Sequence, residues 1–226
     1  MIVDVIIPAY NEQNSIGSVI EAIPKHLVRD IIVVDNNSID ETYINARNAG
    51  AVVVKETGQG YGYACLRGIE KAKENDERAD VIVFLDADFS DHPEEISLLL
   101  NKIWNGADLV IGNRVKSKRS KGSMTPQQVF GNWLACWLMK VLYGYRYRDL
   151  GPFRAIKLDK LIELNMEDKT YGWTVEMQLK ALKQHLVIAQ VDVSYRKRIG
   201  KSKISGTIKG TILAGYKIIS TIFKYK

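Results

Sequence analysis

The sequence predicts an α/β fold of three layers, with a mostly parallel central sheet between two layers of helices. Two observations lead to this prediction. Segments rich in β-branched residues alternate four times with helical segments over about the first half of the chain, the order typical of βαβ units. The strand segments are also continuously apolar, as at residues 81–85, which indicates that helices cover both faces of the sheet.

Each element of the first half has recognisable ends. Strands are predicted at residues 2–7, 30–34, 51–55, 81–85 and 109–111. Pro8 ends the first strand, because a proline cannot donate to a sheet. Helices are predicted from a cap at Asn14 or Ser15 to about His26, and at residues 40–49, 63–75 and 93–105. Gly50 terminates the second helix, and Pro93 fits the first turn of the fourth.

The second half is less regular. Residues 116–124 are basic and rich in glycine and serine, which predicts a mobile loop. Helices are predicted at residues 126–143, 174–184 and 204–223, with a strand at 186–195. Since there is no internal repeat and no separable linker, we expect a single domain over residues 1–226, with functional halves at 1–115 and 116–226.

Composition narrows the class of protein. The 226 residues carry a formal charge of +6, which favours an anionic partner. Cys65 and Cys136 lack CxxC spacing and the chain has 3 histidines, so neither a structural zinc site nor a disulfide framework is expected. The first ten residues do not resemble a signal peptide, and the apolar run at 133–143 is too short to span a bilayer. We therefore expect a cytoplasmic protein, at most bound to the inner face of the membrane.

Polar residues gather where the predicted strands end. Asn11, Asp35, the glycine-rich residues 58–62 and the acidic residues 86–88 all follow strands. Ligands of parallel α/β sheets bind beyond the carboxyl ends of the strands. This coincidence predicts a ligand site at that edge of the sheet.

Asp86 and Asp88 are the candidate metal ligands. On extended backbone, residues i and i+2 point to the same side, so these two carboxylates can hold one cation. Mg²⁺ and Mn²⁺ prefer oxygen ligands, and Mg²⁺ often shares them with substrate phosphates. The alternative is a pair of solvated loop acids.

Three further segments suggest a nucleotide. Asp35 ends a buried strand, where it could accept hydrogen bonds from a base or a ribose. Glu12 lies in the PAYNE turn after the first strand, and Gly60 lies in a loop whose glycines permit close approach of a ligand. The loop after the first strand has no glycine fingerprint, which argues against an NAD-binding domain.

The motifs PAYNE, VVDNNSIDET, GxGYG, FLDADFSDHPEE and VIGNR occur in this order, and the chain resembles the family 2 glycosyltransferases over about residues 3–115. Residues 148–156 (RDLGPFRAI) and 195–207 (YRKRIGKSKISGT) resemble segments of polyprenol-phosphate mannose and glucose synthases. The resemblance implies the Rossmann-like GT-A fold and a Mg²⁺ or Mn²⁺ cofactor. It also implies inverting transfer of a hexose from UDP-glucose or GDP-mannose to a polyprenyl or dolichyl phosphate.

The resemblance further implies roles for individual residues. Nucleotide contacts fall on Pro8, Tyr10, Glu12 and Asp35, metal and diphosphate contacts on Asp86 and Asp88, and phosphate contacts on Arg114 and Arg154. The chain departs from the synthases where Ser90 replaces a glutamine and Asp91 adds an acid, which leaves the third metal ligand open.

Candidates for the chemistry follow from charge. Basic groups that could clamp a diphosphate or an acceptor phosphate are Arg114, Arg154, Arg196, Arg198, Lys201 and Lys203, with a solvated basic face as the alternative. A hydroxyl acceptor would require a general base, for which Glu176 and Asp149 are candidates, whereas a phosphate acceptor is already anionic. An ordinary surface glutamate and a loop cap are the alternatives for these two acids.

The C-terminal helix carries an apolar stripe that is flanked by lysines. The residues of the stripe are Ile204, Ile208, Ile212, Tyr216, Ile219 and Phe223. This pattern suits a helix at an anionic membrane surface. Packing on the core of the protein and a homodimer interface are the alternatives.

Other functions remain open at this stage. The acceptor could be a soluble or glycan hydroxyl instead of a lipid phosphate. A sugar nucleotidyltransferase would share the layers, the metal and the nucleotide, although PAYNEQN lacks its glycine-rich basic loop. No aromatic-interleaved motif indicates nucleic-acid binding.

Overall fold

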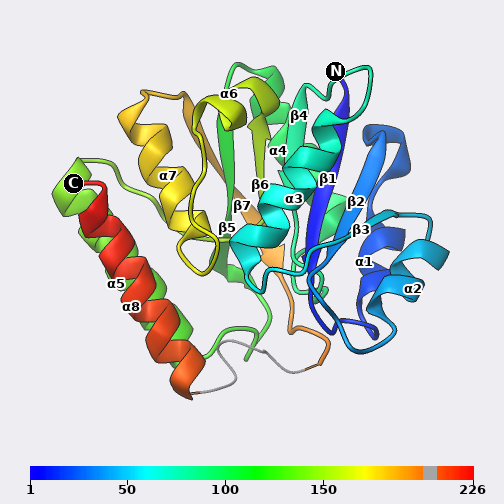
Figure 1. Cartoon of the computed structure of the whole chain (residues 1–226). Helices are drawn as coiled ribbons and strands as arrows, with labels where there is room; N and C mark the ends of the chain where they lie inside the picture. Colours follow the sequence, from blue (N-terminus) through cyan, green and yellow to red (C-terminus); the bar gives the residue numbers. More distant parts are fainter. Residues whose placement is uncertain (201–207) are drawn as a thin grey trace.

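The computed structural model describes residues 1–200 and 208–226 (Figure 1). The described residues form one sheet of seven strands, in which β6 runs antiparallel to both of its neighbours and the remaining pairs are parallel. The order across the sheet is β3 (Val52–Lys55), β2 (Asp30–Asp35), β1 (Val3–Ala9), β4 (Val81–Phe84), β6 (Arg154–Lys157), β5 (Leu109–Arg119) and β7 (Ile188–Tyr195).

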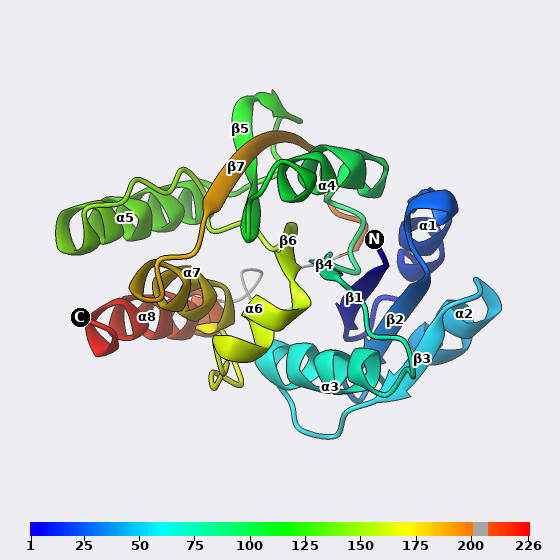
Figure 2. The same ribbon diagram turned by 90° about the horizontal axis from the view of Figure 1, so that it is seen from above.

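Helices cover both faces of this sheet (Figure 2). One face carries α1 (Ile16–Ala22), α2 (Thr42–Asn48) and α4 (Ile96–Trp104), which follows the 3-10 turn η2 (Pro93–Glu95). The other face carries α3 (Tyr61–Lys73), α6 (Leu158–Glu163) and α7 (Trp173–Lys183). Two longer helices, α5 (Pro126–Tyr143) and α8 (Ile208–Lys224), lie side by side next to α7, and the short 3-10 turn η1 (Lys25–Leu27) precedes β2.

The apolar strands explain the two cores. Along β1, Val5 and Ile7 face the α1–α4 side, while Ile6 faces the α3–α7 side, where Phe84 packs edge-on against Trp173 at 6.2 Å between ring centroids. Because both sides of the strands are buried, continuous apolarity is what this sheet requires. The predicted three-layer α/β fold is confirmed.

Two regions of the second half differ from the predictions. The loop expected at residues 116–124 is wrong over 116–119, because β5 extends to Arg119 and pairs there with Tyr195 of β7. The second difference is β6 with the short helix α6, neither of which was predicted. Only four residues long and charged at both ends, β6 lacks the apolar run that marks the other inner strands.

The register brings the strand ends together. Ala9 at the end of β1 lies beside Asp35 at the end of β2, and Phe84 at the end of β4 lies beside Ile6. The turns that follow these three strands therefore share one edge of the sheet, the edge at which a parallel α/β sheet binds ligands.

Candidate active site

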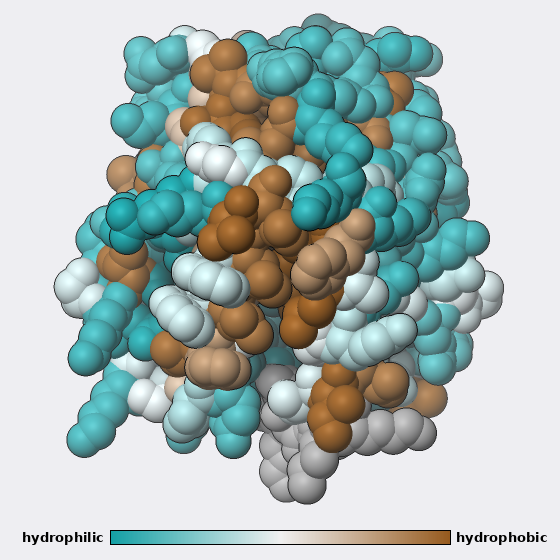
Figure 3. Space-filling model, turned by 90° about the vertical axis from the view of Figure 1, so that its left-hand side faces the viewer, coloured by the Kyte–Doolittle hydropathy of each residue, from teal (hydrophilic) through white to brown (hydrophobic). Residues whose placement is uncertain are grey.

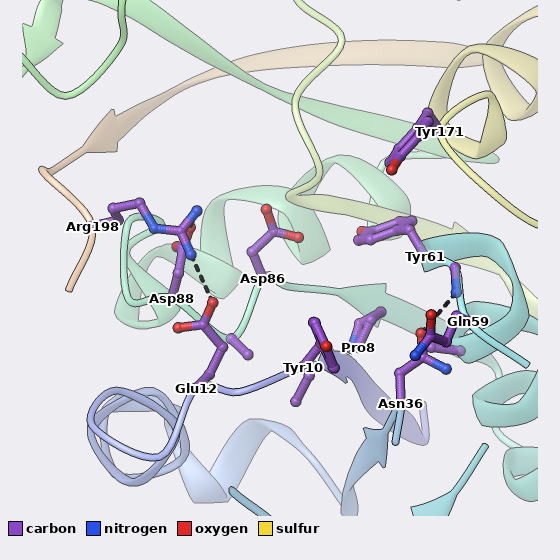
Figure 4. Close-up of a pocket in the computed structure, with 14 residues that line it drawn as sticks. Pro8, Tyr10, Glu12, Asn36, Gln59, Tyr61, Asp86, Asp88, Tyr171 and Arg198 are labelled. Carbon is purple, nitrogen blue, oxygen red and sulfur yellow. Dashed lines mark hydrogen bonds and ion pairs between the residues drawn. The ribbon is translucent and has the colours of Figure 1, made fainter. Parts of the chain in front are cut away.

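A pocket of about 360 Å³ opens at this edge of the sheet (Figure 4). Its walls come from the turns after β1, β2 and β4, from the start of α3, and from two later segments that carry Tyr171 and Arg198. The lining residues are Pro8, Ala9, Tyr10, Glu12, Asn36, Gln59, Gly60, Tyr61, Ala64, Asp86, Ala87, Asp88, Tyr171 and Arg198. Seven predicted site residues are thus brought together: Pro8, Tyr10, Glu12, Gly60, Asp86, Asp88 and Arg198.

Arg198 bridges two acids at one end of the pocket. One guanidinium nitrogen lies 2.6 Å from Glu12 Oε1 and the other lies 3.1 Å from Asp88 Oδ2 (Figure 4). Asp88 also accepts a hydrogen bond from the backbone N–H of Ser90, at 2.9 Å. A positive group is therefore already located among these carboxylates.

Asp86 faces the same pocket without an ion pair among the described contacts. Burial and the neighbouring charge of Asp88 raise the pKa of Asp86 to about 7. Within the described residues, no three His, Cys, Asp or Glu side chains converge as a preformed metal centre. The two aspartates nevertheless supply hard oxygen donors at one wall, which fits a divalent cation that completes its shell with phosphate oxygens and water.

Three further acids follow within residues 91–95, and two of them, Glu94 and Glu95, are directed away from the pocket. Glu95 accepts hydrogen bonds from the N–H and the hydroxyl of Ser194, each at 2.7 Å, and so fastens η2 to β7. Glu94 pairs with His92 and Arg196. Asp91 is buried, and its burial, with the charges of Asp86 and Asp88, raises its pKa well above the ordinary value. Glu94 and Glu95 thus face other partners, whereas Asp91 remains electrostatically close to Asp86 and Asp88, and the raised pKa values of Asp86 and Asp91 reflect the repulsion among these three acids.

The opposite end of the pocket is formed by Asn36 and the loop before α3. Asn36 donates to the carbonyl of Gly58 at 2.6 Å and accepts from the N–H of Gly60 at 2.9 Å. Asp35 itself is buried and does not line the pocket; it accepts from the N–H of Ser38 at 3.2 Å. Among the polar and aromatic lining residues, four were not individually predicted: Asn36, which follows a strand, Gln59 and Tyr61, which lie in the glycine-rich segment, and Tyr171.

Gly60 at the end of this loop and Gly62 in the first turn of α3 leave space for another backbone segment of the protein. A Cβ on Gly60, whose φ is +154°, would lie 2.2 Å from the carbonyl oxygen of Lys169, and one on Gly62 would lie 2.0 Å from that of Asp168. The close approach expected for a ligand is therefore made, at these two positions, by the backbone of residues 168–169.

Arg114 and Asp149 form a pair outside the lining. The guanidinium of Arg114 makes two hydrogen bonds to the Asp149 carboxylate, at 2.8 and 2.6 Å, and its backbone N–H makes a third at 2.7 Å. Burial opposes ionisation of Asp149, but Arg114 holds the pKa of Asp149 below its usual value. The positive charge of Arg114 reaches Asp86 and counteracts the increase in its pKa.

Arg154 is buried at the start of β6. It donates to the backbone carbonyls of Leu150, Gly151 and Thr174, and burial lowers the pKa of its guanidinium. It does not line the pocket.

Glu176 lies in α7 and is fully buried. Its carboxylate accepts from the N–H groups of Glu167 and Asp168 and from the hydroxyl of Tyr225, and it pairs with Lys180. The structure does not bring it to the pocket. Of the other basic candidates, Arg196 donates to the backbone of Asp91, whereas Lys201 and Lys203 lie outside the described residues.

Comparison with known proteins decides the family. The model of glycosyl transferase family 2 matches residues 4–162, which include the turns after β1, β2 and β4. The chain is a family 2 glycosyltransferase. The alternative of a sugar nucleotidyltransferase is thereby removed.

Relatives extend over the whole of this glycosyltransferase. It is 32% identical to an uncharacterized glycosyltransferase of Mycobacterium tuberculosis over 96% of its own length and 98% of the relative. It is 31% identical to the undecaprenyl-phosphate mannosyltransferase of Micrococcus luteus, over 91% and 88% of the two chains. Glucosyl-3-phosphoglycerate synthase from Mycobacterium tuberculosis, solved with Mn²⁺, UDP and phosphoglyceric acid, is similar in fold, with a TM-score of 0.77 at 24% identity over 99% of this chain and 78% of that one.

Proposed function

We propose that this glycosyltransferase moves a hexose, with inversion, from a nucleoside diphosphate sugar to a polyprenyl phosphate at a membrane surface. The observation that carries the proposal is the pairing of Arg198 with Glu12 and Asp88, beside Asp86, at the end of a pocket whose other end is formed by Asn36, Gln59 and Tyr61. A nucleotide occupies the amide and aromatic end, and its diphosphate lies at the end with the charged groups.

Positive charge is what the departing diphosphate requires. A Mg²⁺ or Mn²⁺ ion held by Asp86 and Asp88 would act as a Lewis acid that neutralises that charge. Arg198 supplies a second positive group from the side of Glu12, and Arg114, fixed by Asp149, adds to the positive field behind Asp86. Donors held in place by the fold stabilise the developing charge without reorganising during the reaction.

The hydrogen bonds and ion pairs that already occupy the two candidate general bases, Asp149 and Glu176, favour a phosphate acceptor. A hydroxyl acceptor would require a carboxylate that is free to take a proton. Asp149 is committed to Arg114, and Glu176 is committed to two backbone N–H groups, Tyr225 and Lys180. A lipid phosphate is already an anionic nucleophile, so it does not require a general base.

The outer surface of α5 and α8 suits a lipid acceptor. We name it the α5–α8 face; its members are exposed by 46–73%, and they are Phe130, Trp133, Trp137, Val141, Ile212, Leu213, Tyr216 and Phe223. Figure 3 shows hydrophobic side chains gathered on this side of the molecule. The inward side of α8 packs on the core through Ile218 and Ile222, so the exposed apolar side chains are additional to those that the fold needs.

Charge indicates the occupant of this face. Lys140, Lys224 and Lys226 are exposed on or beside the same two helices, and the chain has a formal charge of +6. Apolar side chains beside lysines bind an anionic bilayer through both burial and electrostatic attraction. Within the described residues, no helix combines the length and apolarity that crossing a membrane requires. The undecaprenyl-phosphate mannosyltransferase of Micrococcus luteus, by its name, supports the same acceptor class.

The test is a transfer assay with three acceptor conditions. The protein is incubated with UDP-glucose or GDP-mannose and Mn²⁺, and with anionic vesicles containing undecaprenyl phosphate, the same vesicles without it, or 3-phosphoglycerate. We expect release of nucleoside diphosphate and formation of glycolipid only in the first condition. Transfer to 3-phosphoglycerate would instead establish a soluble acceptor, and no transfer with any nucleotide sugar would overturn the proposal.

A further inference from the structure

The segment that joins α6 to α7 lies between the C-terminal helix and the donor pocket. We call residues 164–172 the α6–α7 connection. At one end it carries Tyr171, which lines the pocket opposite Asn36 and near Tyr61 (Figure 4). Its backbone at 168–169 is packed against Gly60 of the pocket loop and Gly62 in the first turn of α3.

Glu176 fixes the backbone of this connection. Its two carboxylate oxygens accept the N–H groups of Glu167 and Asp168, at 3.0 and 2.7 Å. The hydroxyl of Tyr225, just after α8, donates to the same carboxylate at 2.7 Å. One buried carboxylate therefore joins α8 to the α6–α7 connection.

Asp168 makes a second link to α8. One of its oxygens accepts from the N–H groups of Thr170 and Gly172, at 2.8 and 3.1 Å, and so shapes the turn that carries Tyr171. Its other oxygen lies 2.9 Å from the ammonium group of Lys217 in α8.

On the pocket side, the contact is made by backbone. The N–H of Tyr63 donates to the carbonyl of Lys169 at 3.1 Å, and the ammonium of Lys169 lies 5.1 Å from the ring of Tyr63. From the other side, the loop is fastened by the hydrogen bonds of Asn36 to Gly58 and Gly60. The wall formed by Gln59, Gly60 and Tyr61 is thus held between Asn36 and the α6–α7 connection.

We propose that Glu176 and Asp168 are positioning residues, through which α8 sets the wall of the donor pocket. Movement of Tyr225 or Lys217 shifts the α6–α7 connection, and the connection shifts Gly60 and Tyr171. The α5–α8 face lies on the outer side of the same helix, so contact with the acceptor surface and affinity for the donor are coupled. The inference rests on the proposed function. It adds that contact of the α5–α8 face with the acceptor surface regulates the affinity of the donor pocket.

Two tyrosine-to-phenylalanine variants isolate this link. Tyr225→Phe removes the hydroxyl that donates to Glu176, which keeps its two backbone partners and Lys180, so the fold is retained. Tyr143→Phe is the matched control, because its hydroxyl also fastens α8, by donating to the carbonyl of Ile222 at 2.6 Å, without touching the α6–α7 connection.

Nucleotide binding is measured by calorimetry with UDP and with GDP, each with Mn²⁺. We expect Tyr225→Phe to weaken binding by about three- to tenfold, as residues that couple two sites do, with kcat at saturating donor little changed. We expect Tyr143→Phe to bind as the unmodified protein does, even if its melting temperature falls equally. Equal affinities in the two variants would overturn the inference, whereas failure of the unmodified protein to bind either nucleotide would overturn the proposed function.

A second measurement needs no ligand. Hydrogen exchange at residues 58–63 reports on the N–H groups of Gly60 and Tyr63, which are held by Asn36 and Lys169. We expect faster exchange there in Tyr225→Phe and no change in Tyr143→Phe. Identical exchange in the two variants would show that α8 does not position this wall.

Discussion

Arg198 and Glu12 are 186 residues apart in the sequence, and their side chains meet at 2.6 Å at one end of the pocket. The contact joins the segment after β7 to the turn after β1, and the second guanidinium nitrogen of Arg198 also lies 3.1 Å from Asp88. A diphosphate that enters this end of the pocket meets a cation that is already oriented by two acids.

Replacing Arg198 by alanine is therefore expected to slow transfer by about 10²-fold or more, the typical effect of removing one fixed charge-stabilising donor. The melting temperature is expected to fall as well, because the side chain of Arg198 is only 25% exposed and its removal takes away a cation that pairs with two buried acids, so turnover is compared at a temperature at which the variant is folded. The control is Arg148→Ala, which removes a surface ion pair with Asp192. Equal turnover in the two variants would exclude Arg198 from the reaction.

Replacing Asp88 by asparagine should abolish the dependence of activity on Mn²⁺ and lower turnover by about 10²–10³-fold, since one of the two proposed oxygen ligands loses its charge. Titration with Mn²⁺, followed by melting temperature, provides a readout besides activity: the ion should stabilise the unmodified protein and not the variant. Asp80→Asn, at the opposite edge of the sheet near Met1, is the control. Retained stabilisation by Mn²⁺ in Asp88→Asn would show that the ion binds elsewhere.

Two helical glycines should respond oppositely to alanine. Gly17 in α1 has nothing within 4 Å of a new Cβ, so Gly17→Ala is expected to stabilise the fold by about 0.5–1 kcal/mol. Gly62 in α3 would place its Cβ 2.0 Å from the carbonyl of Asp168, so Gly62→Ala should cost about 1–3 kcal/mol despite the better helix propensity of alanine. Denaturant unfolding of the pair measures both signs, and stabilisation by both variants would contradict the packing of the α6–α7 connection.

The α5–α8 face should bind membranes through its aromatic side chains. The double variant Trp133→Gln, Tyr216→Gln is expected to weaken sedimentation with anionic vesicles about tenfold, because less apolar area is buried in the lipid interface. Its melting temperature should be unchanged, since these side chains are 58% and 73% exposed. Trp104→Gln, which removes a tryptophan that is 53% exposed in α4, is the control, and equal loss in both would indicate nonspecific adsorption.

Neither cysteine should react in the folded protein. Burial raises the pKa of Cys136 to about 12 and that of Cys65 well above its ordinary value. A raised pKa leaves less of the thiolate, which is the reactive form, at a given pH. A thiol reagent at pH 8 should therefore modify both residues only after unfolding, and rapid modification of the native protein would contradict their burial.

The three layers of the fold and the edge of the sheet that holds the pocket could be predicted from the sequence. Both depend on local patterns, namely apolar strand segments and the polar residues that follow them. The positions of Asp86 and Asp88, directly after a buried strand, likewise predicted that both would lie at this edge, where they line the pocket, whereas their role as metal ligands stays a prediction. The strand β6 could not, since its central place depends on long-range pairing with β4 and β5 and its own sequence, RAIK, carries little apolar pattern.

The contacts of the candidate acids could not be predicted from the sequence either. Nothing local indicates that Glu176 faces inward, because its partners at 167, 168 and 225 come from segments before and after its helix. For a related reason, the sequence predicted Asp35 and not Asn36 as the residue that contacts the ligand. The turn after β2 decides which of the two side chains reaches the pocket, and in this turn Asp35 accepts a hydrogen bond from the backbone N–H of Ser38.

The position of β6 has a consequence for how the polypeptide is completed. Strand β5 does not touch β4, since β6 is inserted between them, so a fragment ending near residue 115 would leave β4 with an unpaired, wholly apolar margin. Such margins promote association with other chains. During synthesis, β4 and β5 cannot be joined in one sheet until β6, which ends at Lys157, has left the ribosome. The segment before residue 115 therefore depends on the later segment to complete the centre of its sheet.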